Sequence, residues 1–297
     1  MCYNIYVITN KKGDMYRMAS IKSEIILECN GAQYNEKDIM DTMVTLGDKI
    51  KFYEAKTRNY LPLEDNMHYV LRCDGRGFSS FCKGLEKPFD NIFRTAMELT
   101  MLDLCKEVQG AYIGYTQSDE ITVIFKKMNP DSDIYFKGGI QKIASTVASK
   151  ATLSFNKHFA AQVDKHAPGD DVYEAHKYIA EFDCRVFAVP VEEAHKVIVW
   201  RIQDCYKNAV QMITRCYYTQ KQINNKTVDD MVKLLLDERN VNVDFDYPDS
   251  VLKGIIAYRD SVVINQGTDK EAYRNKWFSK SVSSFDMKEY MTKYTFI

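Results

Sequence analysis

The sequence predicts an α+β fold in which helices pack on one face of a mainly antiparallel sheet. Between residues 69 and 222, β-rich runs and helix-like stretches alternate in the order strand, helix, hairpin, helix, strand, helix. This order matches the split βαβ arrangement. Two of the β-rich runs are separated by only four residues, which favours an antiparallel hairpin. The chain has 297 residues, 45% hydrophobic and 27% charged, so collagen-like, low-complexity and wholly disordered proteins are excluded.

Residues 1–42 differ from the rest of the chain, and we treat them as an N-terminal extension whose order the sequence does not decide. They contain a short β-like run at Tyr3–Thr9 and an apolar stretch at Ile21–Cys29, interrupted by Asn and Gly. A helix-like stretch, Gly47–Arg58, then ends before Pro62, because proline cannot continue a helix. We expect the main domain to span residues 43–265.

The elements of this main domain are predicted from hydrophobic periodicity. Apolar residues recur at helical spacing after Phe89, for example at Phe93, Met97 and Met101, so this stretch is expected to pack on a core as an amphipathic helix. The expected strands are Tyr69–Cys73, the hairpin Tyr112–Thr116 with Ile121–Phe125, Phe182–Ala188, and Val251–Ile264 with a turn at Asp260; the expected helices are Phe89–Val108, Ile140–Phe159, Val191–Gln222 in two parts, and Thr227–Arg239. Residues 266–297 form a polar C-terminal tail without an assigned element.

Charge and cysteine content limit the function classes. The 40 basic and 41 acidic residues give a net charge of −1, which counts against a protein that coats nucleic acid by bulk attraction but leaves room for a local basic groove. The eight cysteines and five histidines are scattered without zinc-ligand spacing. We interpret the thiols as reduced and the protein as cytoplasmic. No apolar run is long enough for a membrane helix, and the N-terminus does not resemble a signal peptide.

The main chemical feature is acidic. Asp74 follows the first strand of the main domain, and Asp119 and Glu120 lie at the expected hairpin tip. Asp119 comes 45 residues after Asp74. If strand and hairpin pair in one sheet, these carboxylates converge at its edge, where they repel each other unless protonated or bridged by cations. Oxygen ligands of this kind favour Mg²⁺. The alternative interpretation is ordinary turn chemistry, because Asp-Gly and Ser-Asp-Glu are common in loops.

The glycines near Asp74 do not indicate a standard nucleotide-binding motif. Gly75 and Gly77 are separated by one residue, but the segment is not GxGxxG and lacks the Gly-Lys-Ser/Thr end of a Walker loop. They are equally consistent with turn glycines.

Several segments around these carboxylates resemble, in the same order, the motifs of the tRNA-histidine guanylyltransferase superfamily. More narrowly, the chain resembles the guanylyltransferase-like proteins, which are template-dependent 3′-to-5′ RNA polymerases. The resemblance covers roughly Thr45 to Arg259. It is carried by 72–78 (RCDGRGF), 87–90 (KPFD), 114–120 (GYTQSDE), 155–157 (FNK), 182–187 (FDCRVF), Trp200-Arg201, Asp204 and Asn208.

This resemblance implies a polymerase-palm-like (ferredoxin-like) fold, a homo-tetramer and two Mg²⁺ ions. Asp74 and Asp119 match the metal-binding aspartates. Gly75 matches a position that binds metal through its carbonyl oxygen, and Glu120 matches the acidic neighbour in the same motif. The resemblance thus implies catalytic roles for Asp74, Asp119 and Glu120.

The resemblance also implies a nucleotide site for ATP, GTP and other NTPs. Lys87, Asp90 and Ser118 match positions near the bound triphosphate, and Lys142 matches a further triphosphate-contacting lysine. Where many relatives carry arginine, this chain has Gly139, so part of the triphosphate grip differs. The nucleotide-binding loop of the family corresponds here to Arg76, Gly77, Phe78 and Ser79. Without the family, Phe78 would be assigned to the core and Lys142 to a solvated helix face.

One departure separates two activities. Eukaryotic enzymes that add guanosine to histidine tRNA carry His-Ile-Asn-Asn-Leu-Tyr-Asn-Thr where this chain has 206–213, of which Asn208 alone agrees. Phe89 replaces an asparagine of those enzymes. We therefore expect templated repair of the 5′ end of tRNA, with the acceptor stem held by phosphate and 2′-hydroxyl contacts and with Arg201 and Lys207 as candidate basic contacts.

Three alternatives stay open from the sequence. The first is a tRNA-histidine guanylyltransferase that adds a single 5′ guanosine. The second is a non-catalytic RNA-binding relative that keeps the fold, against which the presence of Asp74, Asp119 and Lys87 argues. The third is a nucleotide cyclase-like enzyme, because palm-like cyclases also use two metal-binding aspartates.

Overall fold

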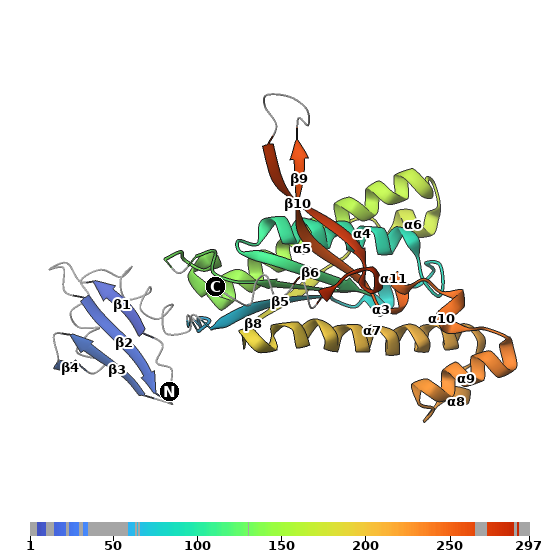
Figure 1. The fold of residues 1–297 in the computed structure, drawn as a ribbon, viewed down its shortest axis with the longest axis horizontal. Helices are drawn as coiled ribbons and strands as arrows, with labels where there is room; N and C mark the ends of the chain where they lie inside the picture. The colour runs from blue at the N-terminus through green and yellow to red at the C-terminus, as the bar shows by residue number, and fades with distance from the viewer. Residues whose placement is uncertain are drawn as a thin grey trace. The chain divides into compact units, whose positions relative to one another are not determined.

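The chain divides into two compact units, one formed by Met1–Pro62 with Lys137–Gln141 and the other by Leu63–Phe136 with Lys142–Ile297. The computed structural model describes residues 5–9, 15–21, 24–29, 32–34, 59–62, 64, 66–129, 131–264, 272–287 and 290 (Figure 1). Within this part of the chain, no helix is long and apolar enough to cross a membrane.

The first unit contains an antiparallel meander of four strands in the order β1-β2-β3-β4. Its strands are β1 (Ile5–Thr9), β2 (Met15–Ile21), β3 (Glu24–Cys29) and β4 (Ala32–Tyr34). Two of them coincide with the β-like run and the apolar stretch seen in the sequence. The expected helix Gly47–Arg58 lies outside the described residues.

The second unit is built on a six-stranded sheet in the order β10-β9-β6-β7-β5-β8, and all of its pairings are antiparallel. The strands are β5 (Met67–Gly75), β6 (Ala111–Gln117), β7 (Glu120–Phe125), β8 (Phe182–Pro190), β9 (Ile255–Ile264) and β10 (Ala272–Ser281). The α+β class expected from the sequence is confirmed.

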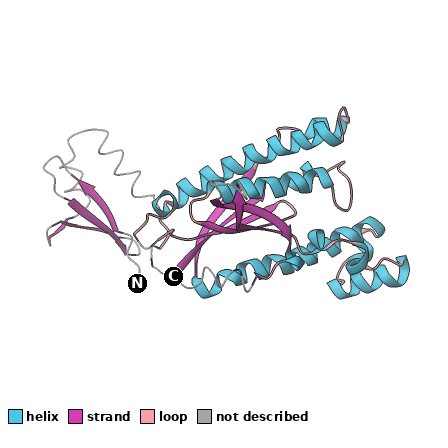
Figure 2. Cartoon of the chain, turned by 45° about the horizontal axis from the view of Figure 1, so that its top comes forward, coloured by secondary structure: helices cyan, strands magenta, loops and turns pink. Residues whose placement is uncertain are grey.

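Two long helices, α4 (Asn91–Glu107) and α5 (Ile140–His166), cover one face of this sheet (Figure 2). Helix α4 buries Phe93, Met97 and Met101 at helical spacing. Around the short helix α3 (Phe78–Phe81), a phenylalanine cluster joins the helices to the sheet. In this cluster the ring of Phe78 lies 4.8 Å from Phe81, 5.9 Å from Phe93, 5.6 Å from Phe155 and 5.1 Å from Phe182.

The opposite face carries one of the helical additions, α7 (Ala194–Tyr217). Its Ala194 and Ile198 pack against Val70, Ile113 and Ile124 of the sheet. The C-terminal half of α7 forms a second small core with the helices that come after it in the chain. The remaining elements are η1 (Tyr135–Gly138), α6 (Asp171–His176), η2 (Val191–Glu193), α8 (Gln220–Ile223), α9 (Val228–Arg239), α10 (Val243–Asp246), α11 (Asp249–Leu252) and η3 (Val282–Ser284).

Several local expectations differ from the structure. The β6–β7 hairpin closes through a two-residue turn, because Gln117 pairs with Glu120, and not through a four-residue loop. Strand β9 begins at Ile255, because Val251 and Leu252 belong to helix α11, so the expected strand start at Val251 is wrong. The strand also runs straight through Asp260, which pairs with Lys276, so the expected turn there is wrong. The polar stretch left unassigned after residue 265 contains β10, whose ladder partner is β9. The sequence signal failed here because much of β10 is exposed, so its pattern lacks a buried face.

Close packing of α4 on the sheet depends on Gly114 of β6. A Cβ atom at this position would lie 2.4 Å from Cys105 Sγ and 3.2 Å from Met101 Cγ, both on α4, and 3.2 Å from Cβ of Ala257 in β9. Only glycine allows the helix to approach the strand this closely.

We expect Gly114→Ala to lower the free energy of unfolding by about 1–3 kcal/mol, the usual cost of overpacking a core. Cys105→Ala removes the sulfur atom that would collide, so the double variant should lose less stability than the sum of the two single variants. Chemical denaturation of the four proteins measures this coupling. If the losses in the free energy of unfolding are strictly additive, the close contact between Gly114 and Cys105 does not limit the packing of α4.

Candidate functional site

Asp74 and Asp119 lie at the same end of the sheet. Strand β5 pairs with β7 so that Asp74 lies opposite Glu120, and with β8 so that it lies opposite Asp183. The amide of Gly75 donates a hydrogen bond to the carbonyl oxygen of Asp119 at 3.0 Å. Two residues 45 positions apart are thereby brought to the same strand ends, as the sequence predicts.

Gly75 is required at this corner by the packing below it. A Cβ atom on Gly75 would lie 2.3 Å from Cδ2 of Phe78. The ring of Phe78 is buried in the phenylalanine cluster, so it cannot move aside easily. The Asp-Gly end of β5 therefore packs directly against the buried ring of Phe78.

The turn that presents Asp119 is tight. Ser118 adopts a left-handed backbone conformation with φ of 48°, and its hydroxyl donates to Asp119 Oδ1 at 3.0 Å. The hydroxyl of Thr116 donates to the carbonyl oxygen of Glu120 at 2.9 Å across the same turn. These bonds hold the hairpin tip in one geometry.

The carboxyl groups at the hairpin tip are partly buried and lie close to one another. Burial raises the pKa of Asp119, and the nearby Asp74 charge raises it further, against the hydrogen bond from Ser118. Burial also raises the pKa of Glu120 to about 7, although Arg201 and Arg72 oppose this shift. Such a cluster is relieved by proton uptake or by a bound cation.

The chemistry of the donor set fits a hard cation that takes further ligands from a substrate. In the described part of the chain, no group of three or more His, Cys, Asp or Glu side chains is gathered to hold a metal ion. The candidate site is a pair of carboxylates beside a backbone carbonyl. Mg²⁺ is typically bound by one or two carboxylates together with waters and substrate phosphates, and not by an all-protein cage.

A pocket of about 410 Å³ opens beside this end of the sheet. Its wall includes the strand end before Asp119, the segment between α3 and α4, and the side of α7. Volume and mixed lining are those of a small-molecule site. The polar lining is Ser79, Lys83, Glu86, Lys87, Asp90, Arg94, Thr116, Gln117, Ser118, Asn208, Arg215 and Ser250, and the apolar lining includes Leu85, Phe89, Phe93, Met97, Ala209, Met212 and Val251.

Half of the eight expected nucleotide-site residues line this pocket. Ser79, Lys87, Asp90 and Ser118 line it, and so does Asn208 of α7. Asp204 lies one turn before Asn208, and its Oδ2 accepts a hydrogen bond from Asn208 Nδ2 at 3.2 Å.

Asp90 is engaged in structure as well as facing the pocket. It is the N-cap of α4, and its Oδ1 accepts from the amide of Phe93 at 2.8 Å. Its other oxygen accepts from the amide of Glu86 at 3.0 Å and from the hydroxyl of Tyr173. The carboxylate is therefore a fixed part of the pocket wall.

Four expected contacts lie apart from the pocket lining. Phe78 is buried in the core, and Gly77 forms the left-handed turn before α3 with φ of 68°. Arg76 is exposed and pairs with Glu181 at 2.9 Å. The ammonium of Lys142 lies 4.8 Å from the ring of Phe136. Their roles toward a nucleotide stay predictions.

Sequence analysis missed three cations of the pocket, Lys83, Arg94 and Arg215, and misjudged the buried Arg201. Arg94 lines the pocket and donates to Ser250 Oγ at 2.9 Å; its position four residues after the N-cap Asp90, on the same side of α4, was the available signal. Arg201 was expected to contact tRNA, which is wrong, because it is 5% exposed and bonded to Glu120 and Asp204. Lys207 is exposed on the same helix.

Comparison with known proteins identifies the family. The family model described as tRNAHis guanylyltransferase matches residues 47–190. An uncharacterised protein of Acanthamoeba polyphaga mimivirus is 31% identical over 212 residues, which are 67% of this chain and 71% of that protein. A probable tRNA(His) guanylyltransferase of Dictyostelium discoideum is 26% identical over 224 residues, 70% of this chain and 80% of that protein.

Solved structures agree with the sequence comparisons. A bacterial tRNA(His) guanylyltransferase-like protein in complex with ATP superimposes with a TM-score of 0.69 and 29% identity, over 85% of this chain and 100% of that one. A structure of such a protein in complex with GTP gives a TM-score of 0.65 and 26% identity, over 85% and 99%. Fold, motif order and sequence similarity point the same way: the chain belongs to the tRNA(His) guanylyltransferase superfamily, a family of nucleotidyltransferases.

Proposed function

We propose that the protein adds nucleotides to the 5′ end of tRNA in the 3′-to-5′ direction, with an opposing strand as template. The observation that carries this proposal is the pair of carboxylates, Asp74 and Asp119, at the edge of a pocket of nucleotide size. Phosphoryl transfer depends mainly on positioning and on neutralising phosphate charge. An acidic strand end beside a lysine-bearing pocket supplies both.

The pocket is suited to an NTP. Lys87 and Lys83 offer point charges for phosphate oxygens, and the hydroxyls of Ser79 and Ser118 offer donors nearby. The apolar part of the lining, including Phe89 and Met212, suits a nucleobase. The bacterial guanylyltransferase-like structures contain ATP and GTP, which supports purine triphosphates as ligands here.

In this proposal, Asp74, Asp119 and the carbonyl oxygen of Gly75 hold Mg²⁺. When bound, two such ions would neutralise the phosphate charge and polarise the reacting phosphate. The rest of the chain binds and orients. Lys87 and Ser118 align the triphosphate, while the bonds around Ser118 and Thr116 keep the Asp119 turn from moving as charge shifts.

The proposed reaction joins the incoming NTP to the 5′ end of the RNA. The 3′-hydroxyl of the incoming NTP attacks the 5′ phosphorus of the RNA and forms a phosphodiester bond. A 5′-monophosphate end first reacts with ATP, which releases pyrophosphate and leaves an adenylylated end from which AMP then departs. A 5′-triphosphate end instead releases pyrophosphate directly. Base pairing to the opposite strand selects the NTP, so the protein has to read only the shape and backbone of the acceptor stem. The family resemblance further suggests a homo-tetramer.

Templated addition is favoured over single guanosine addition by the lining of α7. The segment that differs from the guanosine-adding enzymes begins at Tyr206, whose hydroxyl lies 3.4 Å from Asp244 Oδ2. It includes Ala209 and Met212, which face the pocket together with Phe89. This apolar surface has few polar groups to read one particular base, so selection by template pairing suits it better.

Replacement of Asp119 tests the role of the two carboxylates. Asp119→Asn should lower the rate of 5′ extension of a truncated tRNA, with NTPs and Mg²⁺ present, by at least about a hundredfold, because it removes a charged metal ligand. Asp237→Asn, on the exposed side of α9, is the matched control and should extend at the wild-type rate. Gel analysis of 5′-labelled products measures both. Unchanged extension in Asp119→Asn would rule out the two-carboxylate mechanism.

Competition between two RNAs separates the two activities. With equal amounts of a 5′-truncated tRNA and a full-length histidine tRNA in one reaction, the truncated tRNA should be extended first, and only by the nucleotide that pairs with its template base. Preferential addition of one guanosine to the histidine tRNA, whatever the opposite base, would instead identify a guanylyltransferase. Binding of both RNAs without any extension would indicate a non-catalytic relative.

A further inference from the structure

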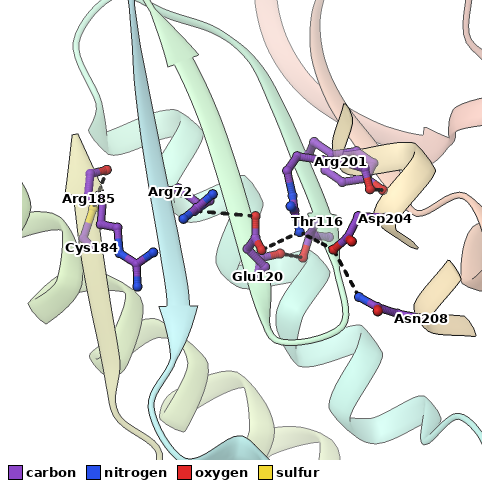
Figure 3. Close-up of polar contacts among 9 residues, drawn as sticks. Arg72, Thr116, Glu120, Cys184, Arg185, Arg201, Asp204 and Asn208 are labelled. Carbon is purple, nitrogen blue, oxygen red and sulfur yellow. Dashed lines mark hydrogen bonds and ion pairs between the residues drawn. The ribbon is translucent and has the colours of Figure 1, made fainter. Parts of the chain in front are cut away.

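Arg201 is a buried cation that joins helix α7 to the hairpin tip. Its Nη2 donates to Glu120 Oε2 at 2.7 Å and to Asp204 Oδ2 at 3.0 Å. Figure 3 shows the guanidinium reaching from α7 toward the hairpin, with Asp204 beside it. Because only 5% of the residue is exposed, it has no surface with which to bind RNA.

Glu120 receives this guanidinium on one side and a second one on the other. Arg72 of β5 lies 4.0 Å from Glu120 Oε1. The indole of Trp200 lies 4.4 Å from the guanidinium carbon of Arg201 and 5.6 Å from that of Arg72. The side chain of Glu120, on β7, is thus flanked by guanidinium groups from two other elements, β5 and α7 (Figure 3).

The position of Glu120 determines the position of Asp119. The two are adjacent residues, and Glu120 closes the two-residue turn by pairing with Gln117. Glu120 is also opposite Asp74 in the β5–β7 ladder. A displacement of Glu120 therefore changes the separation between the two carboxylates of the candidate metal site.

Arg201 is bonded to Asp204, which is in turn bonded to Asn208. Asn208 donates to the same Asp204 oxygen that accepts from Arg201, at 3.2 Å. Asn208 lines the nucleotide pocket. A continuous chain of hydrogen bonds therefore runs from the pocket wall through Asp204 and Arg201 to the hairpin tip.

This network is poorly suited to a purely stabilising role. Buried ion pairs contribute little net stability, because both charges lose their hydration. Here Oε1 of Glu120 and Nε of Arg201 are also buried without a hydrogen-bond partner in the described structure. We therefore expect the network to act mainly by fixing the position of Glu120.

We propose that Arg201 is a positioning residue for the metal site. By fixing Glu120 it sets the spacing of Asp74 and Asp119, although it touches neither the metal nor the substrate. The inference rests on the proposed function for the identity of the site, but it is tested by metal binding without RNA.

The test uses Arg201→Met and Arg201→Lys in the full chain, with Mn²⁺ as the probe. Electron paramagnetic resonance titration should show Mn²⁺ bound roughly tenfold or more weakly by Arg201→Met, the size expected when the support of a metal ligand is lost. Arg201→Lys should lose less, because an ammonium can still bond to Glu120. In extension assays, the half-saturating Mg²⁺ concentration should rise in the same order, whereas the KM for NTP should change by less than about threefold.

Two further variants separate positioning from folding. Glu120→Gln/Arg201→Met removes both charges and should regain most of the Tm lost by Arg201→Met, yet still bind Mn²⁺ weakly. Ser154 belongs neither to the pocket lining nor to the Arg201 network. Ser154→Ala removes the 2.7 Å hydrogen bond to Asp103 between α5 and α4, so it should lower Tm and leave Mn²⁺ affinity unchanged.

The outcomes are distinct. Wild-type Mn²⁺ affinity in Arg201→Met, or affinity restored in the double variant, overturns the positioning role. An equal loss of affinity in Ser154→Ala also overturns it, since general destabilisation would then explain the effect. If wild-type protein binds Mn²⁺ in an Arg201-dependent way but extends no RNA, the proposed function fails and the positioning role stands.

Discussion

The register between β5 and β7 is the constraint on which the rest of the site depends. Opposite residues in an antiparallel ladder share a face, and a slip of one position would exchange the two faces of the sheet. With Asp74 opposite Glu120, the amide of Gly75 reaches the carbonyl of Asp119, and both acids stand at the strand ends. The hydrophobic residues around them enforce this register, because Val70 and Ile124 pack on the side of α7 while Val123 points to the other face. Core packing and the spacing of the acids are therefore specified together.

Much of this arrangement could be predicted from the sequence, for reasons visible in particular residues. Strand β5 and helix α4 have strong periodicity and clear turns, and the 45-residue separation of Asp74 and Asp119 contains one long helix and one strand, as convergence requires. The pocket was only partly predictable. Ser79, Lys87 and Ser118 lie near recognisable motifs, whereas Ser250 and Arg215 come from distant parts of the chain that carry no local signal.

Two of the wrong predictions, for Arg201 and for the stretch that forms β10, also have physical reasons. Arg201 looked like a surface cation because arginine is mostly exposed, and nothing in its neighbourhood announces a partner 81 residues away. Strand β10 was missed because a strand with much of its length exposed has no clear hydrophobic alternation. The near-equal charge totals were informative only about the whole chain: opposite charges lie side by side at the hairpin tip, a level of detail that composition does not contain.

The carboxylate of Asp90 has a consequence for how a ligand would be received. This one side chain caps the N-terminus of α4 and accepts a hydrogen bond from the amide of Glu86, which fixes the loop. It also accepts a hydrogen bond from the hydroxyl of Tyr173 in α6. These bonds exist before any nucleotide arrives, so the loop that carries Lys87 is already ordered when the protein folds. The conformational entropy of that loop is lost in folding rather than in association, and a preorganised wall of this kind lets binding energy appear as affinity.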